Sequence, residues 1–161
     1  MKYIITEDQY ERLAQEEKIL ELPDLSYFNN DWNSLQEYLK RKGNPKYSIM
    51  GNLDLGGTPI KSLGNLTSVG GDLNLYGTSI ESLGNLTSVG GNLNLVGTSI
   101  KSLGNLTSVG GNLNLYVTPI ESLGNLSSVG GYLELRENPI SKKYSKKEIR
   151  NMVKVDGKIY I

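Results

Sequence analysis

Asparagine, tyrosine and acidic side chains recur at a 20-residue spacing through the middle of this 161-residue chain. Tyrosine combines a large apolar ring with a hydrogen-bonding hydroxyl, and asparagine offers both donors and acceptors, so such a set is typical of a recognition surface. The same asparagines could instead bond only to neighbouring repeats, with the tyrosines filling gaps between them. The candidate binding residues are Asp72, Asn74, Tyr76, Asn92, Asn94, Val96, Asn112, Asn114, Tyr116, Tyr132, Glu134 and Arg136.

Catalytic and metal-binding chemistry has little support in the sequence. The chain has no cysteine and no histidine, which excludes thiolate and imidazole ligands, cysteine nucleophiles and Ser/His/Asp triads. Asp54 and Asp72 stand in neighbouring repeats and come closest to an acid/base pair or to a carboxylate site for a divalent cation. They would lie on an open sheet without a pocket, so we expect no enzyme activity, no metal site and no cofactor.

Charge and hydropathy restrict the class of partner. Seventeen basic and seventeen acidic residues give a formal net charge of zero, so no global field draws the chain to nucleic acid or to an anionic membrane. The opening residues turn acidic at Glu7, before any apolar run of signal-peptide length, and no run approaches the roughly 20 apolar residues of a membrane span. We therefore expect a monomeric cytoplasmic protein with neither a nucleic-acid nor a membrane partner.

The repeats follow one template with a period of 20 residues. The row from Gly71 to Gly90 reads GDLNLYGTSIESLGNLTSVG, and the next row reads GNLNLVGTSIKSLGNLTSVG. Each row contains an L-x-L pair, and a spacing of two is the period of a β-strand. Six apolar columns recur from row to row and can line one continuous interior. They start at Leu53, Leu55, Ile60, Leu63, Leu66 and Val69.

The pattern L-x-L-x-x-T-x-I, with a further L-x-x-L downstream, resembles the leucine-rich repeat family, whose signature is L-x-x-L-x-L-x-x-N-x-L. The resemblance covers residues 47–140, with about five repeats. It implies an α/β repeat fold, namely a leucine-rich repeat solenoid with a concave parallel β-sheet, and a partner bound on the outward positions that flank each L-x-L. Threonine replaces the family's usual asparagine in four rows, at Thr58, Thr78, Thr98 and Thr118.

A period of 20 leaves no room for a full helix on the convex side. We therefore expect the stretch Gly-Asn-Leu-Thr-Ser-Val-Gly-Gly to run as extended chain and tight turns. Glycines such as Gly64, Gly70 and Gly71 would supply positive φ or close approach between turns. Lys61, Glu81, Lys101 and Glu121 alternate in sign at one position of the repeat, which predicts ion pairs between adjacent turns.

Residues 1–46 are expected to form an α-helical N-terminal segment that caps the repeats, because a repeat array must close its open ends. Asp31 as N-cap and Gly43 as terminal glycine bound one helix, whose last turn contains three cations. Upstream, residues 2–5 predict a short strand, and a capping box at Thr6 predicts a helix that ends near Leu20.

Residues 141–161 form a basic C-terminal cap with seven cations and two anions. Val153 and Val155 fall 20 residues after Leu133 and Leu135, which predicts a sixth strand in the same sheet. Residues 158–161 would then close that edge. We interpret the charge of this segment as that of a solvated cap that protects a sheet edge.

Three functions are consistent with these features. The first is a non-enzymatic leucine-rich repeat module that binds a macromolecular partner on its concave sheet, a protein in the first place and a glycan in the second. The second is a structural spacer or assembly component that uses its ends or N-terminal helices. The third is adsorption to ice or another surface through the threonine column. The opening segment is similar to small bacteriophage and bacterial proteins, which implies the host cytoplasm if the chain is phage-encoded.

Overall fold

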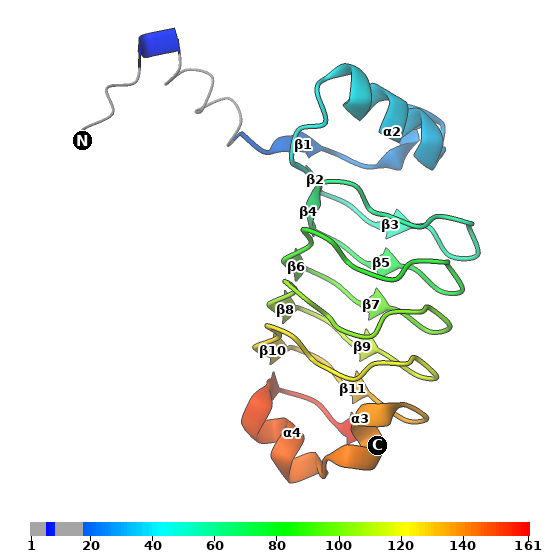
Figure 1. Cartoon of the computed structure of the whole chain (residues 1–161), viewed down its shortest axis with the longest axis vertical. Helices are drawn as coiled ribbons and strands as arrows, with labels where there is room; N and C mark the ends of the chain where they lie inside the picture. Colours follow the sequence, from blue (N-terminus) through cyan, green and yellow to red (C-terminus); the bar gives the residue numbers. More distant parts are fainter. Residues whose placement is uncertain (1–5, 9–17) are drawn as a thin grey trace.

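The computed structural model describes residues 6–8 and 18–161, and it shows a β-solenoid built from two parallel sheets of short strands (Figure 1). One sheet has seven strands, in the spatial order β1 (Leu20–Leu22), β2 (Tyr47–Ile49), β4 (Leu66–Val69), β6 (Ser88–Val89), β8 (Ser108–Val109), β10 (Ser128–Val129) and β12 (Lys154–Val155). The other has six strands, in the order β3 (Leu53–Asp54), β5 (Leu73–Asn74), β7 (Leu93–Asn94), β9 (Leu113–Asn114), β11 (Leu133–Glu134) and β13 (Ile159–Tyr160).

The chain winds once around the solenoid axis in every 20 residues of the repeat section. Leu53 pairs with Leu73, and the same register continues in 20-residue steps to Leu93, Leu113 and Leu133. The coil therefore has about four regular turns, where the sequence predicted about five repeats, because the chain after Leu135 leaves the 20-residue path. All strand pairings in the described residues are parallel, as expected for a coil of one hand.

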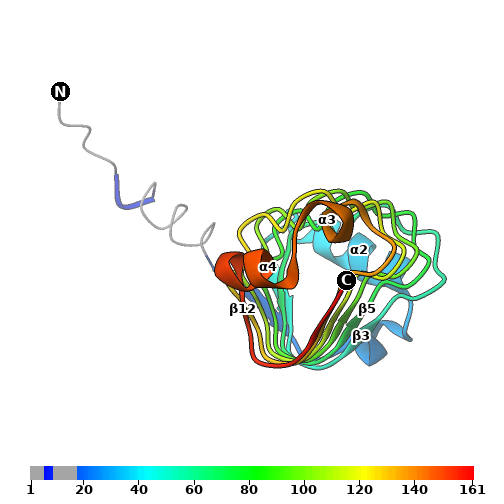
Figure 2. The ribbon, with the colours of Figure 1, turned by 90° about the horizontal axis from the view of Figure 1, so that it is seen from below.

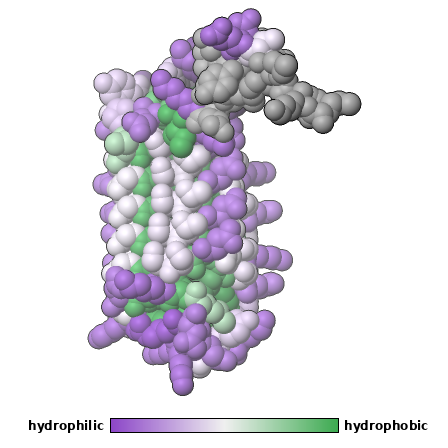
Figure 3. Space-filling view, turned by 90° about the vertical axis from the view of Figure 1, so that its left-hand side faces the viewer, coloured by the Kyte–Doolittle hydropathy of each residue, from purple (hydrophilic) through white to green (hydrophobic). Residues whose placement is uncertain are grey.

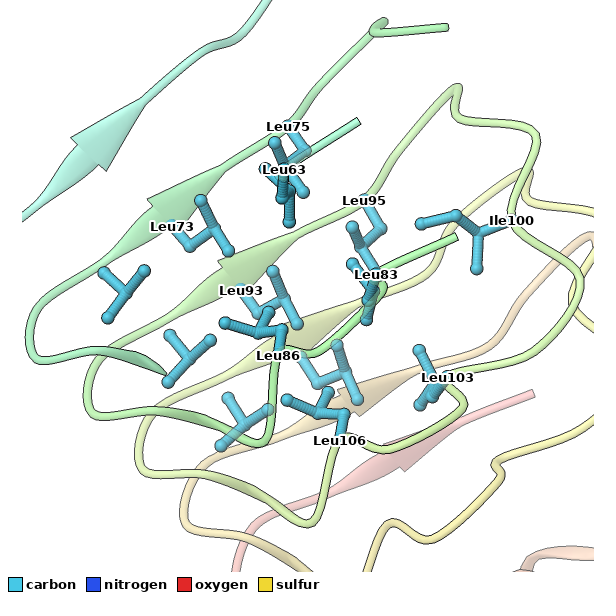
Figure 4. Close-up of a cluster of buried hydrophobic side chains, with 14 of the residues drawn as sticks. Leu63, Leu73, Leu75, Leu83, Leu86, Leu93, Leu95, Ile100, Leu103 and Leu106 are labelled. Carbon is cyan, nitrogen blue, oxygen red and sulfur yellow. The ribbon is translucent and has the colours of Figure 1, made fainter. Parts of the chain in front are cut away.

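The six apolar columns fill the space between the two sheets, as the sequence predicts. Figure 4 shows leucines of successive turns stacked on one another, among them Leu73, Leu93, Leu86 and Leu106. Every member of the six columns from Leu53 to Ile140 is buried except Ile60, which is partly buried and packs against the core. This regular interior is what makes the turns stack in register.

The seven-stranded sheet was not predicted from the sequence. The Thr-Ser-Val stretch, expected as extended chain and turns, forms the two-residue strands that pair Ser68 with Ser88 and continue along the coil. Figure 2 shows the two sheets converging at one corner, with irregular chain on the remaining side. In the described residues 51–138 that side carries no helix, as expected. The turns stack along a nearly straight axis (Figure 1), so the six-stranded sheet presents an even outer face instead of the concave one that the sequence predicted.

Glycine is required at the corner between the two sheets because adjacent turns approach each other closely there. A Cβ atom on Gly90 would fall well inside contact distance of the carbonyl oxygen of Gly70, one turn earlier. Gly110 and Gly130 meet the preceding turn in the same way. A different requirement holds at Gly64, whose φ of 59° lies in the left-handed region.

The helix that the N-terminal signals predict is present as α2 (Trp32–Arg41). Its N-cap Asp31 accepts the backbone N–H of Ser34 at 2.9 Å, and Gly43 has a φ of 85° just beyond its end. A short 3₁₀ helix, η1 (Leu25–Phe28), precedes it. The prediction of a helix ending near Leu20 is wrong at that end, because Leu20 begins strand β1 and pairs with Tyr47. The strand predicted at residues 2–5, and residues 9–17 of that helix, lie outside the described residues.

The predicted sixth strand exists, but its register is wrong. Val155 pairs with Val129 in the seven-stranded sheet, and Ile159, not Val153, pairs with Leu133. The last turn therefore takes 26 residues. Two short helices, α3 (Pro139–Lys143) and α4 (Lys146–Met152), occupy the additional length. Residues 158–161 lie at the edge of the six-stranded sheet through β13, as expected.

Candidate binding face of the six-stranded sheet

The residues that precede each L-x-L form a hydrogen-bonded ladder on the outer side of the six-stranded sheet. Oδ1 of Asn52 accepts the backbone N–H of Asp72 at 2.8 Å, and Oδ1 of Asp72 accepts that of Asn92 at 2.6 Å. In the next two turns, Oδ1 of Asn92 accepts the backbone N–H of Asn112 at 2.8 Å, and Oδ1 of Asn112 accepts that of Tyr132 at 2.9 Å. The side-chain oxygens of this column therefore hold successive turns together.

The middle residue of each L-x-L bonds within its own turn. Oδ1 of Asn74 accepts the backbone N–H of Tyr76 at 3.1 Å, and Asn94 and Asn114 make the same bond two residues onward. These bonds fix the chain where each strand ends. The side-chain amides of Asn94 and Asn114 donate no hydrogen bond within residues 18–161.

Asp54 and Asp72 do not form the acid/base pair that the sequence allowed. Asp54 is the middle residue of its L-x-L and accepts the backbone N–H of Gly56 at 3.0 Å and Nδ2 of Asn74 at 2.8 Å. Asp72 belongs to the other column and is engaged by Asn92. Among the described residues, no group of three or more acidic, cysteine or histidine side chains could hold a metal ion.

The third column exposes large side chains beyond the hydrogen-bonded asparagines. Tyr76 is 55% exposed and Tyr116 is 41% exposed, with the partly buried Val96 between them one turn from each. With more than half of Tyr76 in solvent, its ring does not act as a filler between neighbouring residues. The outer face thus consists of polar side chains that are hydrogen-bonded within the coil and of exposed aromatic rings beside them.

Three tyrosines, one arginine and one glutamate gather at the C-terminal end of this face. We call this group the arginine corner; its residues are Tyr116, Tyr132, Glu134, Arg136 and Tyr160. Nε and Nη2 of Arg136 donate to the two carboxylate oxygens of Glu134 at 2.9 and 2.7 Å. The guanidinium carbon lies 5.8 Å from the ring centre of Tyr116 and 5.5 Å from that of Tyr160. The rings of Tyr132 and Tyr160 meet edge to face at 5.8 Å.

The arginine corner is held in one arrangement by its buried carboxylate. The Glu134 side chain is 8% exposed, whereas that of Arg136 is 57% exposed. Burial by itself raises the pKa of the Glu134 carboxyl, but the hydrogen bonds and positive charge of Arg136 more than offset that effect and leave this pKa below its ordinary value. A bidentate ion pair of this kind fixes the guanidinium plane, so little conformational entropy remains to be lost on binding.

The structure brings all twelve sequence-predicted binding residues to one face, and it adds Tyr160, which the sequence analysis missed. Tyr160 joins the face because β13 pairs with β11 and places it beside Glu134. The signal was present in the sequence as Ile159-Tyr160-Ile161, which repeats the L-x-L pattern at the end of the chain.

Three of the four threonines in the repeat column lie inside the coil, and Thr58 is partly buried. Thr78, Thr98 and Thr118 are 2–4% exposed. Their hydroxyls donate to the carbonyl oxygen three residues earlier, at 2.9 Å in the case of Thr78 and Leu75. These threonines therefore do not provide the exposed array that adsorption to ice or another surface requires.

The alternating charged column does not form the predicted ion pairs. Lys61, Glu81, Lys101 and Glu121 are exposed, and none of them lies within salt-bridge distance of an opposite charge in the part of the chain that the structure describes. Exposed ion pairs between long side chains contribute little free energy in water, so alternating charges at one position of the repeat need not pair.

Comparison of the chain with protein-family models, with curated proteins and with solved structures gives no match. None of the helices in the described ranges is long and apolar enough to cross a membrane.

Proposed function

We propose that this chain is a non-enzymatic binding module whose six-stranded sheet contacts a macromolecular partner, a protein in the first place and a glycan in the second. The observation that carries the proposal is the group of exposed tyrosines, Tyr76, Tyr116, Tyr132 and Tyr160, on a face whose asparagine oxygens are already bonded within the coil. Tyrosine and arginine are the residues most often found at the energetic centre of protein interfaces.

The family resemblance supports the same face. In the leucine-rich repeat proteins that the sequence resembles, the residues flanking each L-x-L bind the partner, and we propose that this coil is a short-repeat variant of that type. We further propose that α2 is its N-terminal cap, because Trp32, Leu35 and Leu39 are buried on one side of the helix. Gln36 also donates to the hydroxyl of Tyr47 at 3.2 Å.

The test compares capture of partners by three purified chains: the wild type, Tyr76→Ala/Tyr116→Ala, and the control Tyr27→Ala. Tyr27 is 79% exposed and lies in η1, which borders β3 at the N-terminal end of the six-stranded sheet. It therefore matches the chemistry of the change at a position outside the twelve candidate residues. Truncating a central tyrosine costs about 1–2 kcal/mol of binding free energy, so the double variant should bind a captured and purified partner about 30-fold more weakly or worse.

The control should bind like the wild type. Equal binding by the double variant and the control would overturn the proposal. It would favour the spacer alternative, in which the ends of the coil make the contacts.

A further inference from the structure

A shallow groove runs along the solenoid axis on the outer side of the seven-stranded sheet. Figure 3 shows this side of the molecule, with pale columns of small residues running the length of the coil beside apolar ones. The groove has a volume of about 480 Å³ and is lined by serines, valines and glycines of successive strands from β2 to β12. This volume is within the usual range of ligand sites, roughly 300–1,000 Å³.

The serines in the groove are not engaged by the protein. Their register runs from strand to strand through Ser48, Ser68, Ser88, Ser108 and Ser128. Within residues 18–161 these five hydroxyls make no hydrogen bond.

Other recurring hydroxyls of the repeat do have partners. That of Thr87 donates to the carbonyl of Thr67 at 3.0 Å, and that of Ser62 accepts the N–H of Gly64 at 3.0 Å. The serine column is therefore polar without a role in holding the coil together.

Ser48 is the buried member of this column, and its burial is the second observation that points to a ligand. It is only 7% exposed and lines the groove, yet its hydroxyl has no partner in the described chain. No fully buried side-chain oxygen or nitrogen in those residues lacks a partner, so the Ser48 hydroxyl must reach its bonding groups through the groove. A nearly buried hydroxyl that opens only toward a groove is a group that a ligand can satisfy.

The groove is uncharged over most of its length. Its only charged lining residues are Lys154 and Asp156 at the C-terminal end, which pair with each other at 3.5 Å. Its glycines leave no room for a side chain, because a Cβ on Gly90 or Gly110 would strike the preceding turn. A ligand therefore meets backbone, glycine and serine, because the valines of these strands are buried in the core. It finds no row of cations such as a nucleic-acid backbone requires.

The spacing between successive serine hydroxyls can be compared with the repeat distance of each class of uncharged ligand. One hydroxyl recurs per turn, at the spacing of adjacent strands, about 4.8 Å. An extended peptide presents side chains to one face every ~6.6 Å, so it loses register with the serines after one step. A fully extended β-linked glycan advances by about one strand spacing per sugar unit and presents hydroxyls along its whole length.

We propose that this groove binds an uncharged, extended β-linked polysaccharide whose chain runs along the solenoid axis. The serine hydroxyls exchange hydrogen bonds with successive sugars, and the exposed glycine backbone beside them contacts the faces of the rings. This site lies on the opposite sheet from the proposed protein-binding face and is independent of it.

The test is binding of the full chain to microcrystalline cellulose, a β-linked glucan, and to cellohexaose by calorimetry. Starch granules, an α-linked glucan of coiled shape, are the ligand control. The variant Ser88→Leu/Ser108→Leu fills the middle of the groove. The matched control Ser79→Leu/Ser99→Leu places the same side chains at exposed serines of the same repeats, outside the groove.

The wild type and the matched control should bind cellulose and cellohexaose, and the groove variant should fall to the level of an inert protein. Ser88→Ala/Ser108→Ala, which leaves the shape of the groove unchanged, should bind more weakly than wild type even if the leucine variant fails to fold. Absence of wild-type binding, or equal binding by wild type and the alanine variant, would overturn the inference.

Tyr76→Ala/Tyr116→Ala separates this site from the proposed protein-binding face. That variant should retain cellulose binding. If it loses cellulose binding while the groove variants keep it, the glycan lies on the six-stranded sheet and the groove proposal fails.

Discussion

Replacing Gly90 by alanine should destabilise the coil more than the same change at Gly77, although both glycines belong to the same repeat. A methyl group on Gly90 would fall on the carbonyl oxygen of Gly70, so the two turns must move apart at the corner. A methyl group on Gly77 would meet nothing within 4 Å. Its cost is the positive φ of 64°, which an alanine adopts less readily than glycine.

The contacts at the corner set the size of the effect. The N–H of Gly90 donates to Val69 at 2.8 Å, and the N–H of Gly91 donates to Gly71 at 2.9 Å. Weakening both bonds costs about 1–3 kcal/mol, at roughly 0.5–1.5 kcal/mol each. Overpacking adds about 1–3 kcal/mol, and the lower entropy of the unfolded alanine chain returns about 0.4–1 kcal/mol. Together these terms span about 1–5.5 kcal/mol, and the middle of that range gives a net loss at Gly90 of about 2–4 kcal/mol, against about 1 kcal/mol at Gly77.

Thermal unfolding followed by circular dichroism measures both changes. A loss of 2–4 kcal/mol corresponds to a fall in Tm of about 5–15 °C for a chain of this size, and the Gly77→Ala chain should unfold only a few degrees below wild type. If Gly90→Ala unfolds at or above the temperature of Gly77→Ala, the corner does not depend on close approach between turns and the reasoning is refuted.

Three further predictions concern the arginine corner, the C-terminal end and the repeat itself. The pKa of Glu134 is depressed in the folded chain, so the stability that it contributes is present above its unfolded pKa and is lost as the pH falls through its folded pKa. Urea unfolding from neutral to acidic pH should therefore show a steeper loss of unfolding free energy for wild type than for Glu134→Gln. Deleting residues 141–161 removes the strands that pair with β10 and β11 and leaves two open edges, so the truncated chain should form oligomers, and a monomer by size-exclusion chromatography with light scattering would contradict this. Deleting residues 71–90 removes one complete turn in register, so circular dichroism should show a folded chain with lower Tm, whereas an unfolded product would show that the turns are not interchangeable.

The repeat core could be predicted from the sequence because each buried position is occupied by leucine, isoleucine or valine in nearly every row. The second sheet could not be predicted in this way. Strands of both sheets are short, but each strand of the six-stranded sheet from β3 to β11 is marked by two leucines two positions apart, such as Leu73 and Leu75. Strands such as Ser88–Val89 have a single buried residue and no such alternation from which they can be recognised. Backbone pairing between neighbouring turns, which depends on the whole coil, makes them strands.

The last turn was predicted in the wrong register because Val153 and Val155 have the L-x-L spacing and stand one 20-residue period after Leu133 and Leu135. The competing signals were helical. Pro139 stands at the first position of α3, and Ser145 and Glu148 form a capping box at the start of α4, with the Ser145 N–H donating to Glu148 at 2.8 Å. Two helices need more chain than a turn of extended backbone, so the strand register shifts to Ile159.

The positions of the binding residues could be predicted, but their internal bonding could not. A 20-residue period places the twelve candidates on one face, because residues in register share a side of the sheet. It does not reveal that Asn74, Asn94 and Asn114 use their oxygens within their own turns, or that Glu134 is buried beneath Arg136. Those contacts depend on the local path of the backbone at the end of each strand.

The ladder on the six-stranded sheet determines where an additional repeat could be inserted with its hydrogen bonds formed. Each rung from Asn52 to Asn112 offers an oxygen to the turn that follows, and the series stops at Tyr132, whose ring has no carboxamide to offer the next turn. A duplicated 20-residue unit inserted between Asn52 and Asn112 would find both its donor and its acceptor ready, whereas one added after Tyr132 would find no side-chain oxygen to accept its N–H. Such an array can lengthen by internal duplication, and the near-identity of its middle rows is the record that this kind of growth would leave.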